Sequence, residues 1–114
     1  MVPFQSMDPH QLAEERSLAY HRVVAARLVD DPRLLVEARA RVEQWLANGT
    51  RAARALERWR SILELPPSEI AALLVDSGEL ARELRQSSPF AGALDPRERW
   101  RIWRAVRAAH PELG

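Results

Sequence analysis

The sequence predicts an all-α protein, a compact single-domain bundle of five to six short helices. Apolar residues recur every three or four positions along most of the chain, and no stretch alternates as a strand would. Asp-Pro opens three segments, at Asp8-Pro9, Asp31-Pro32 and Asp95-Pro96. Asp is favoured as a helix N-cap and Pro at the first helical position, so these pairs predict three helix starts. The 114 residues suffice for one core without a disulfide or a metal.

The first two predicted helices run from about Pro9 to Val29 and from Pro32 to about Ala47, where Asn48-Gly49 is a good C-terminal stop. Gln11 stands where it would complete a capping box. The short link between the helices predicts antiparallel neighbours. The residues expected to face the core are Leu12, Ala19, Tyr20, Val23 and Ala26 in the first helix and Leu35, Ala38, Val42 and Trp45 in the second.

Three shorter elements follow in the middle of the chain. We expect a third helix from a Thr50 N-cap to about Glu64, a fourth over 69–75 capped by Ser68, and a fifth over about 79–86. Pro66-Pro67 separates the third from the fourth, and a tight turn containing Gly78 separates the fourth from the fifth. The third helix is expected to bury Ala52, Leu56, Trp59 and Leu63.

The last predicted helix begins at Asp95-Pro96 and ends at His110, after an irregular link in which Phe90 is the expected packing anchor. Its apolar residues share one broad arc, and Arg97, Arg101 and Arg104 lie together on the opposite arc. This division predicts that the last helix packs into the bundle through its tryptophans. The core is therefore expected to form around Trp45, Trp59, Trp100 and Trp103.

The beginning of the chain and its composition give further expectations. Residues 1–6 resemble the remnant of a protease-cleavable tag, so the domain is expected to comprise residues 7–114. The chain has no apolar run of membrane-spanning length and no secretory segment, which predicts a cytoplasmic protein. All 17 basic residues are arginine, as is typical of a GC-rich bacterial genome, and the net charge of +1 gives no general attraction to nucleic acid.

Two arginine stripes are the predicted partner-binding surface, one on the third helix and one on the last. Each stripe repeats at helical spacing, so its guanidinium groups project together toward an acidic partner. If Trp59 and Trp103 pack against each other, the two stripes flank one seam. Phe90 adjoins the last helix and is expected to add an apolar anchor. The predicted site residues are Arg97, Arg101, Arg104, Phe90, Arg51, Arg54 and Arg58.

Nucleic-acid binding and ribonuclease activity are the two alternatives. Residues 68–87 read as a helix–turn–helix, which with the arginine faces would suit a DNA- or RNA-binding regulator, but Glu79 and Glu83 on its second helix disfavour phosphate contact. Arg16 and His21, like Arg104 and His110, fit the loose Arg-x4–6-His pattern of small helical ribonucleases of the HEPN class. Seventeen arginines and three histidines produce about this many matches by chance.

Residues for other chemistry are scarce. The chain lacks cysteine and has no glycine-rich phosphate loop. Adjacent acids such as Glu14-Glu15 point to different helix faces, and His10 with Glu14 is too few ligands for a metal site. We therefore expect no enzymatic activity, no cofactor and no metal.

The block Leu84–Arg104, with the sequence LRQSSPFAGALDPRERWRIWR, is similar to a block in small uncharacterised bacterial proteins. Those proteins are encoded in toxin–antitoxin-like operons, some beside nucleotidyltransferase-like toxins. The resemblance implies a binding role and assigns no functional residue. The sequence is thus interpreted as a non-enzymatic interaction module, antitoxin-like, that neutralises a protein partner such as a cognate toxin. A homodimer is left open, nucleic acid is not favoured and no membrane is expected.

Overall fold

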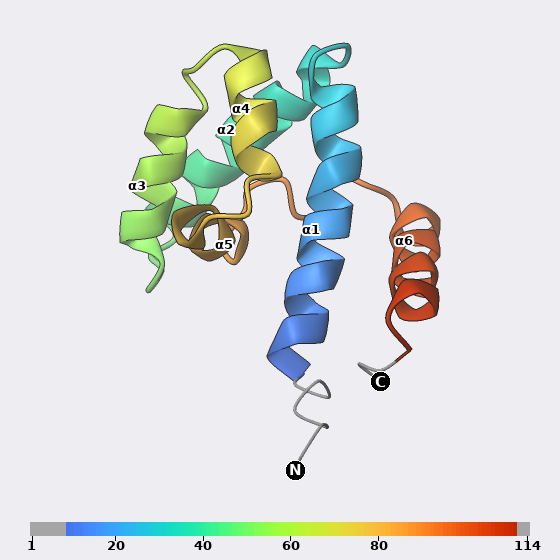
Figure 1. The fold of residues 1–114 in the computed structure, drawn as a ribbon. Helices are drawn as coiled ribbons and strands as arrows, with labels where there is room; N and C mark the ends of the chain where they lie inside the picture. Colours follow the sequence, from blue (N-terminus) through green and yellow to red (C-terminus); the bar gives the residue numbers. More distant parts are fainter. Residues whose placement is uncertain (1–8, 112–114) are drawn as a thin grey trace.

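The computed structural model describes residues 9–111, and this part of the chain consists of six helices without a strand (Figure 1). The predicted all-α bundle is confirmed. None of the helices in residues 9–111 combines the length and apolar character that a membrane span requires. The helices are α1 (Pro9–Leu28), α2 (Pro32–Ala47), α3 (Ala53–Ile62), α4 (Pro67–Leu74), α5 (Glu79–Arg85) and α6 (Pro96–Ala109).

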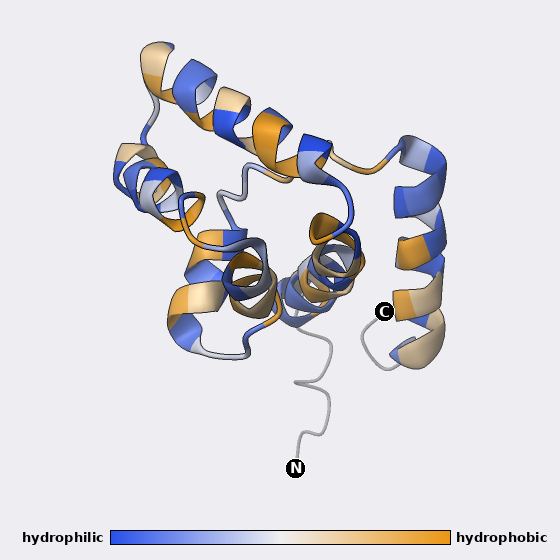
Figure 2. Ribbon diagram, turned by 90° about the horizontal axis from the view of Figure 1, so that it is seen from above, coloured by the Kyte–Doolittle hydropathy of each residue, from blue (hydrophilic) through white to orange (hydrophobic). Residues whose placement is uncertain are grey.

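Helix α1 is the centre of the arrangement. It packs against α4 and α6 and also contacts α2 and α5, whereas α3 packs on α2. Helices α3 and α6 lie on opposite sides of the molecule (Figures 1 and 2). The expectation that α1 and α2 are antiparallel is wrong, because α2 runs across α1 and bridges it to α3.

Two of the three Asp-Pro starts lie within the described residues, and both are confirmed. Asp31 accepts a hydrogen bond from the backbone N–H of Arg33 at 3.2 Å, at the start of α2. Asp95 accepts one from the backbone N–H of Glu98 at 2.9 Å, at the start of α6. Each carboxylate thereby satisfies a backbone donor that the first helical turn leaves free. The predicted cap at Asp8, the tag-like residues 1–6 and residues 112–114 lie outside the described residues.

The other two predicted caps are wrong. Helix α3 begins at Ala53 rather than after Thr50, whose hydroxyl instead accepts from the N–H of Ala52 at 3.0 Å in the turn before the helix. Helix α4 begins at Pro67, before Ser68, with Pro66 in the cap position. Proline suits the first helical position because its fixed φ matches the helix and it has no N–H to leave unpaired.

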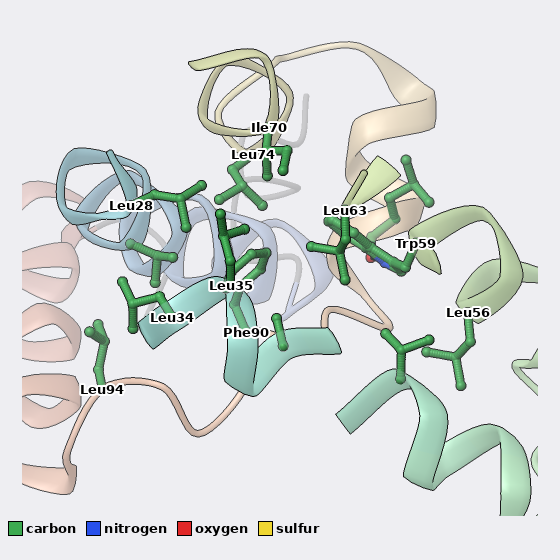
Figure 3. Close-up of a cluster of buried hydrophobic side chains, with 14 residues drawn as sticks. Leu28, Leu34, Leu35, Leu56, Trp59, Leu63, Ile70, Leu74, Phe90 and Leu94 are labelled. Atoms are coloured by element: carbon green, nitrogen blue, oxygen red, sulfur yellow. The ribbon is translucent and has the colours of Figure 1, made fainter. Parts of the chain in front are cut away.

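The core is a cluster of buried apolar side chains from α1 to α5 and from the link that precedes α6 (Figure 3). Helix α6 adds Val106, which is buried, and Ile102, which is partly buried. The core cluster comprises Val24, Leu28, Leu34, Leu35, Ala38, Val42, Leu56, Trp59, Leu63, Ile70, Leu74, Leu84, Phe90 and Leu94.

The four tryptophans do not share this core, contrary to expectation. Trp59 is 1% exposed, donates from Nε1 to the Leu84 carbonyl at 2.9 Å and meets Phe90 edge-on. Trp45 is partly buried at the edge of the cluster. Trp100 and Trp103 are 58% and 40% exposed, because α6 packs mainly on α1 and buries Val106 instead. The two tryptophans of α6 are therefore surface residues.

Candidate functional site

A cleft of about 670 Å³ lies between α1 and α6, and we refer to it as the α1–α6 cleft. The end of α2, the turn before α3, Leu56 of α3 and the segment from Arg85 to Gly92 complete its walls. Its volume lies in the range of ordinary ligand-binding sites. The lining residues that bear on binding are Arg16, Tyr20, Trp45, Arg85, Arg99 and Trp103.

The His21 imidazole ties α1 to the segment before α6. Its Nδ1 lies 2.7 Å from the Ser17 carbonyl oxygen, and its Nε2 lies 2.8 Å from the Ser88 hydroxyl. Because a carbonyl only accepts, Nδ1 carries the proton and Nε2 accepts from Ser88. Burial lowers the pKa of His21 to about 4; the Ser17 hydrogen bond opposes this, and the charge of Arg85 reinforces it. His21 is therefore neutral at physiological pH.

The Tyr20 hydroxyl shapes the wall that residues 88–94 form. It donates to the Phe90 carbonyl at 2.6 Å and accepts from the backbone N–H groups of Ala93 and Leu94 at 3.1 and 3.2 Å. On the other side of this segment, Arg41 donates to the Pro89 carbonyl at 3.0 Å. The irregular link is thus held by side chains from α1 and α2, because it has few backbone partners of its own.

Arg85 is a buried cation in the wall of the cleft. It is 8% exposed and donates to the carbonyl oxygens of Leu74 and Asp76 at 3.1 and 2.8 Å. Burial is the main cause that lowers the pKa of Arg85, yet a guanidinium stays protonated in proteins. Arg85 therefore joins α5 to the end of α4 and adds positive charge to the cleft.

Arg16 and Trp103 form the contact between α1 and α6 at the cleft. The guanidinium carbon of Arg16 lies 3.5 Å from the ring centroid of Trp103, the geometry of a cation–π interaction. The Nε of Arg16 is buried and has no hydrogen-bond partner within the described residues. Among the described residues, an aromatic ring and no carboxylate therefore holds Arg16 in position.

The exposed Trp100 extends this surface along α6. Its ring centroid lies 6.4 Å from that of Trp103. A second, smaller depression of about 240 Å³ lies at Trp100, and it shares Arg99 and Trp103 with the α1–α6 cleft. The two hollows therefore form one continuous surface with Trp103 between them.

The predicted partner-binding residues lie elsewhere, or are inaccessible. Phe90 is fully buried among core residues, so its prediction as an apolar anchor for a partner is wrong. Arg97, Arg101 and Arg104 are exposed on α6, and none of them lines the α1–α6 cleft.

The arginine stripe of α3 is separate from that of α6. Arg54 and Arg58 are exposed on α3, which lies on the opposite side of the molecule from α6 (Figure 1), and Arg51 is exposed in the turn before α3. Trp59 packs on Phe90 and Trp103 on Arg16. The expectation that the two stripes flank one seam is therefore wrong.

The structure also shows where the residues predicted for nucleic-acid binding and for ribonuclease activity lie. On α5, the exposed side chains are Glu79, Leu80, Arg82 and Glu83, so the outward face of the second helix of the 68–87 unit carries more negative than positive charge. Arg16 and His21 do line one cleft, but both ring nitrogens of His21 are engaged by Ser17 and Ser88. The Nε2 of His110 lies 3.4 Å from a carboxylate oxygen of Glu15, and neither His110 nor Arg104 lines that cleft.

No three His, Asp or Glu side chains gather into a metal site anywhere in residues 10–111. Sequence reasoning missed Arg99, Trp45 and the cleft role of Arg16, although Arg16 and Tyr20 lie four residues apart on one face of α1. The sequence matches no protein-family model, and neither a curated protein nor a solved structure matches it.

Proposed function

We propose that the protein is a non-enzymatic interaction module that binds a partner protein through the α1–α6 cleft and the adjoining tryptophans. The observation that carries this proposal is the exposed pair Trp100 and Trp103 at a concave, arginine-lined surface. Exposed aromatic surface at a hollow is characteristic of interaction sites. Tryptophan and arginine are also the residue types that most often dominate binding energy at protein interfaces.

The resemblance to proteins of toxin–antitoxin-like operons concerns the same part of the molecule. Residues 84–104 include the end of α5, the link and the first part of α6, which supply two walls of the cleft. This coincidence supports an antitoxin-like role, in which the module occludes the functional site of a cognate toxin. The product of a neighbouring gene is therefore the first partner to test.

Ser88 and His21 lie as close together as a catalytic nucleophile and its base. The surroundings of the two side chains nevertheless argue against catalysis. Both side chains are about 5% exposed, and the Ser88 hydroxyl also accepts from the N–H of Phe90 at 3.1 Å. A general base works best when its pKa lies near the operating pH. With a pKa of about 4, His21 is too weak a base at neutral pH. The pair therefore supports a structural role.

Co-expression of the full chain with the product of the adjacent reading frame tests the proposal. We expect the two proteins to copurify, and the variants Trp100→Ala and Trp103→Ala to weaken the complex by about 2 kcal/mol or more, the scale of an interface hot spot. Isothermal titration calorimetry measures this loss, and circular dichroism confirms that the variants keep their helices.

The matched control is Val36→Ala, which truncates another exposed apolar side chain, 61% exposed on α2 and outside the cleft. It should bind as the wild type does. Unchanged affinity of both tryptophan variants would show that the partner docks on another face.

A further inference from the structure

We infer that the occupant of the α1–α6 cleft is an acidic segment of the partner protein, which places a carboxylate between Arg16 and Arg99 and an apolar side chain against the tryptophans. This inference rests on the proposed function and names the chemistry that the cleft recognises. Three observations support it: the charge of the residues that line the cleft, the availability of Arg16 and Arg99 for an ion pair, and the continuation of the cleft into the depression at Trp100.

The charge of the lining is one-sided. Among residues 9–111, eighteen line the cleft, of which three are arginines and none is Asp or Glu. The whole chain is nearly balanced, with 17 arginines against 16 acids, so the lining does not follow the composition. Low-dielectric walls that carry one sign of charge concentrate the field in a cleft and favour the opposite charge there. The occupant is therefore anionic.

Arg16 and Arg99 are the two guanidinium groups available to such an occupant. Other arginines of the bundle already have carboxylate partners, as in the Arg27–Glu98 and Arg60–Glu43 pairs. Within residues 10–111 neither Arg16 nor Arg99 forms an ion pair. Arg16 is also held in place by Trp103. A positioned guanidinium binds a carboxylate with two parallel hydrogen bonds, at little further cost in side-chain entropy.

The aromatic and apolar lining defines the rest of the occupant. Trp45, Ala52 and Leu56 line the cleft together with Trp103. The surface then continues into the depression at Trp100, through the shared residues Arg99 and Trp103. A surface that runs on from a cleft along a helix suits a chain segment with successive side chains better than a single compact metabolite. The favoured occupant is a peptide segment with an acidic residue next to an aromatic or aliphatic one.

A selection from a random dodecapeptide library, displayed on phage and panned against the full chain, tests this inference. Enriched sequences should contain Asp or Glu next to Trp, Phe or Leu. Their synthetic peptides are then titrated by fluorescence anisotropy at physiological ionic strength. We expect Arg16→Gln and Arg99→Gln each to weaken binding about tenfold or more. Replacing the acidic residue of the peptide by its amide should cause a similar loss of affinity. Combining this peptide with an arginine variant should cause little further loss, because both changes remove the same interaction.

The matched control is Arg101→Gln, which removes the same charge from an exposed position of the same helix, two residues from Arg99 and outside the cleft. It should change affinity by no more than about twofold. Because Arg16 is partly buried, Arg16→Lys is a second variant that keeps the charge. It should bind better than Arg16→Gln if the charge is what the peptide recognises.

The other outcomes separate this inference from the proposed function. Peptides that lack acids and depend on Trp103 but not on Arg16 or Arg99 would overturn the inference and leave the proposed function standing. If no enriched peptide depends on Trp103, both fail. If ATP or inorganic pyrophosphate binds with dependence on Arg16 while no peptide does, the occupant is a small phosphate compound and the inference is overturned.

Discussion

The imidazole Nε2 of His21 and the hydroxyl of Ser88 meet at 2.8 Å in the interior, where they join α1 to the segment that leads into α6. The hydroxyl of Tyr20, the residue before His21, holds the same segment at three backbone groups. Further along α1, Arg27 pairs with Glu98 of α6. Since α6 packs mainly on α1, these contacts determine the position of α6 and of the cleft wall that it forms.

The His21 contact predicts a pH-dependent stability. Its pKa falls from the ordinary 6.5 to about 4 on folding, so between these values the unfolded state binds more protons than the folded state. This contribution is complete above the unfolded pKa and is lost as the pH falls toward 4. Acidification from about pH 7 to about pH 5 should lower the free energy of unfolding by about 2 kcal/mol through this group. Urea denaturation at the two pH values measures the difference.

Two histidine variants assign that difference to its residue. His21→Asn should be less stable at neutral pH but lose less stability on acidification than the wild type. His110→Asn leaves the buried His21 site intact and should therefore keep the pH dependence that this site causes. If His21→Asn and the wild type respond equally to acid, the buried imidazole does not titrate as proposed.

Tyr20→Phe tests how the link is held. The change removes the hydroxyl that serves the Phe90 carbonyl and the N–H groups of Ala93 and Leu94. The Phe90 carbonyl and the Ala93 N–H keep the 3.0 Å hydrogen bond between them, so the main loss falls on the Leu94 N–H, and it should cost about 1–3 kcal/mol in chemical denaturation. Hydrogen exchange at Ala93 and Leu94 should become faster. Ser87→Ala is the control, because that hydroxyl makes only a 3.4 Å contact with the Leu84 carbonyl, and it should cost less than about 0.5 kcal/mol.

The fold class, the helix starts at Asp31-Pro32 and Asp95-Pro96 and the end near His110 could be predicted because each follows from local chemistry. Which tryptophan is buried could not. Trp100, Trp103 and Val106 do share one face of α6. Which part of this face contacts α1 is decided by the link before α6 and by the Arg27–Glu98 ion pair. A helix rotated slightly on its neighbour buries Val106 and leaves both rings at the edge.

The cleft could not be predicted from the sequence for a related reason. Arg16, Arg85 and Arg99 come from three elements, and only tertiary packing brings them together. Helical spacing groups Arg97 and Arg101 in one stripe, whereas Arg99 lies two residues from each and therefore on the other side of the helix, so the stripe did not mark it. Phe90 illustrates the opposite error. Phe90 was predicted both to anchor the link by packing and to offer an apolar anchor to a partner, and its place in the core beside Trp59 fits the first role and excludes the second.

The contrast between the tryptophans predicts their effects on stability. Trp59→Ala empties a fully buried site and removes the bond to the Leu84 carbonyl, so it should cost about 3–5 kcal/mol. Trp100→Ala truncates a side chain that is 58% exposed and should cost less than about 1 kcal/mol. Urea denaturation of the two variants gives both values. A loss at Trp100 as large as at Trp59 would mean that α6 is more deeply packed than this structure has it.

The last prediction concerns nucleic acid, the alternative ligand. Binding a duplex requires several cations on one face, because affinity comes largely from released counterions. Here the arginine stripes of α3 and α6 lie on opposite sides (Figure 1), and α5 exposes Glu79 and Glu83. We therefore expect the isolated chain to bind a random-sequence duplex no tighter than roughly micromolar at physiological salt, by fluorescence anisotropy. The double variant Glu79→Arg/Glu83→Arg should bind more tightly. A tight wild-type complex that weakens steeply with salt would favour a DNA-binding regulator over a protein-binding module.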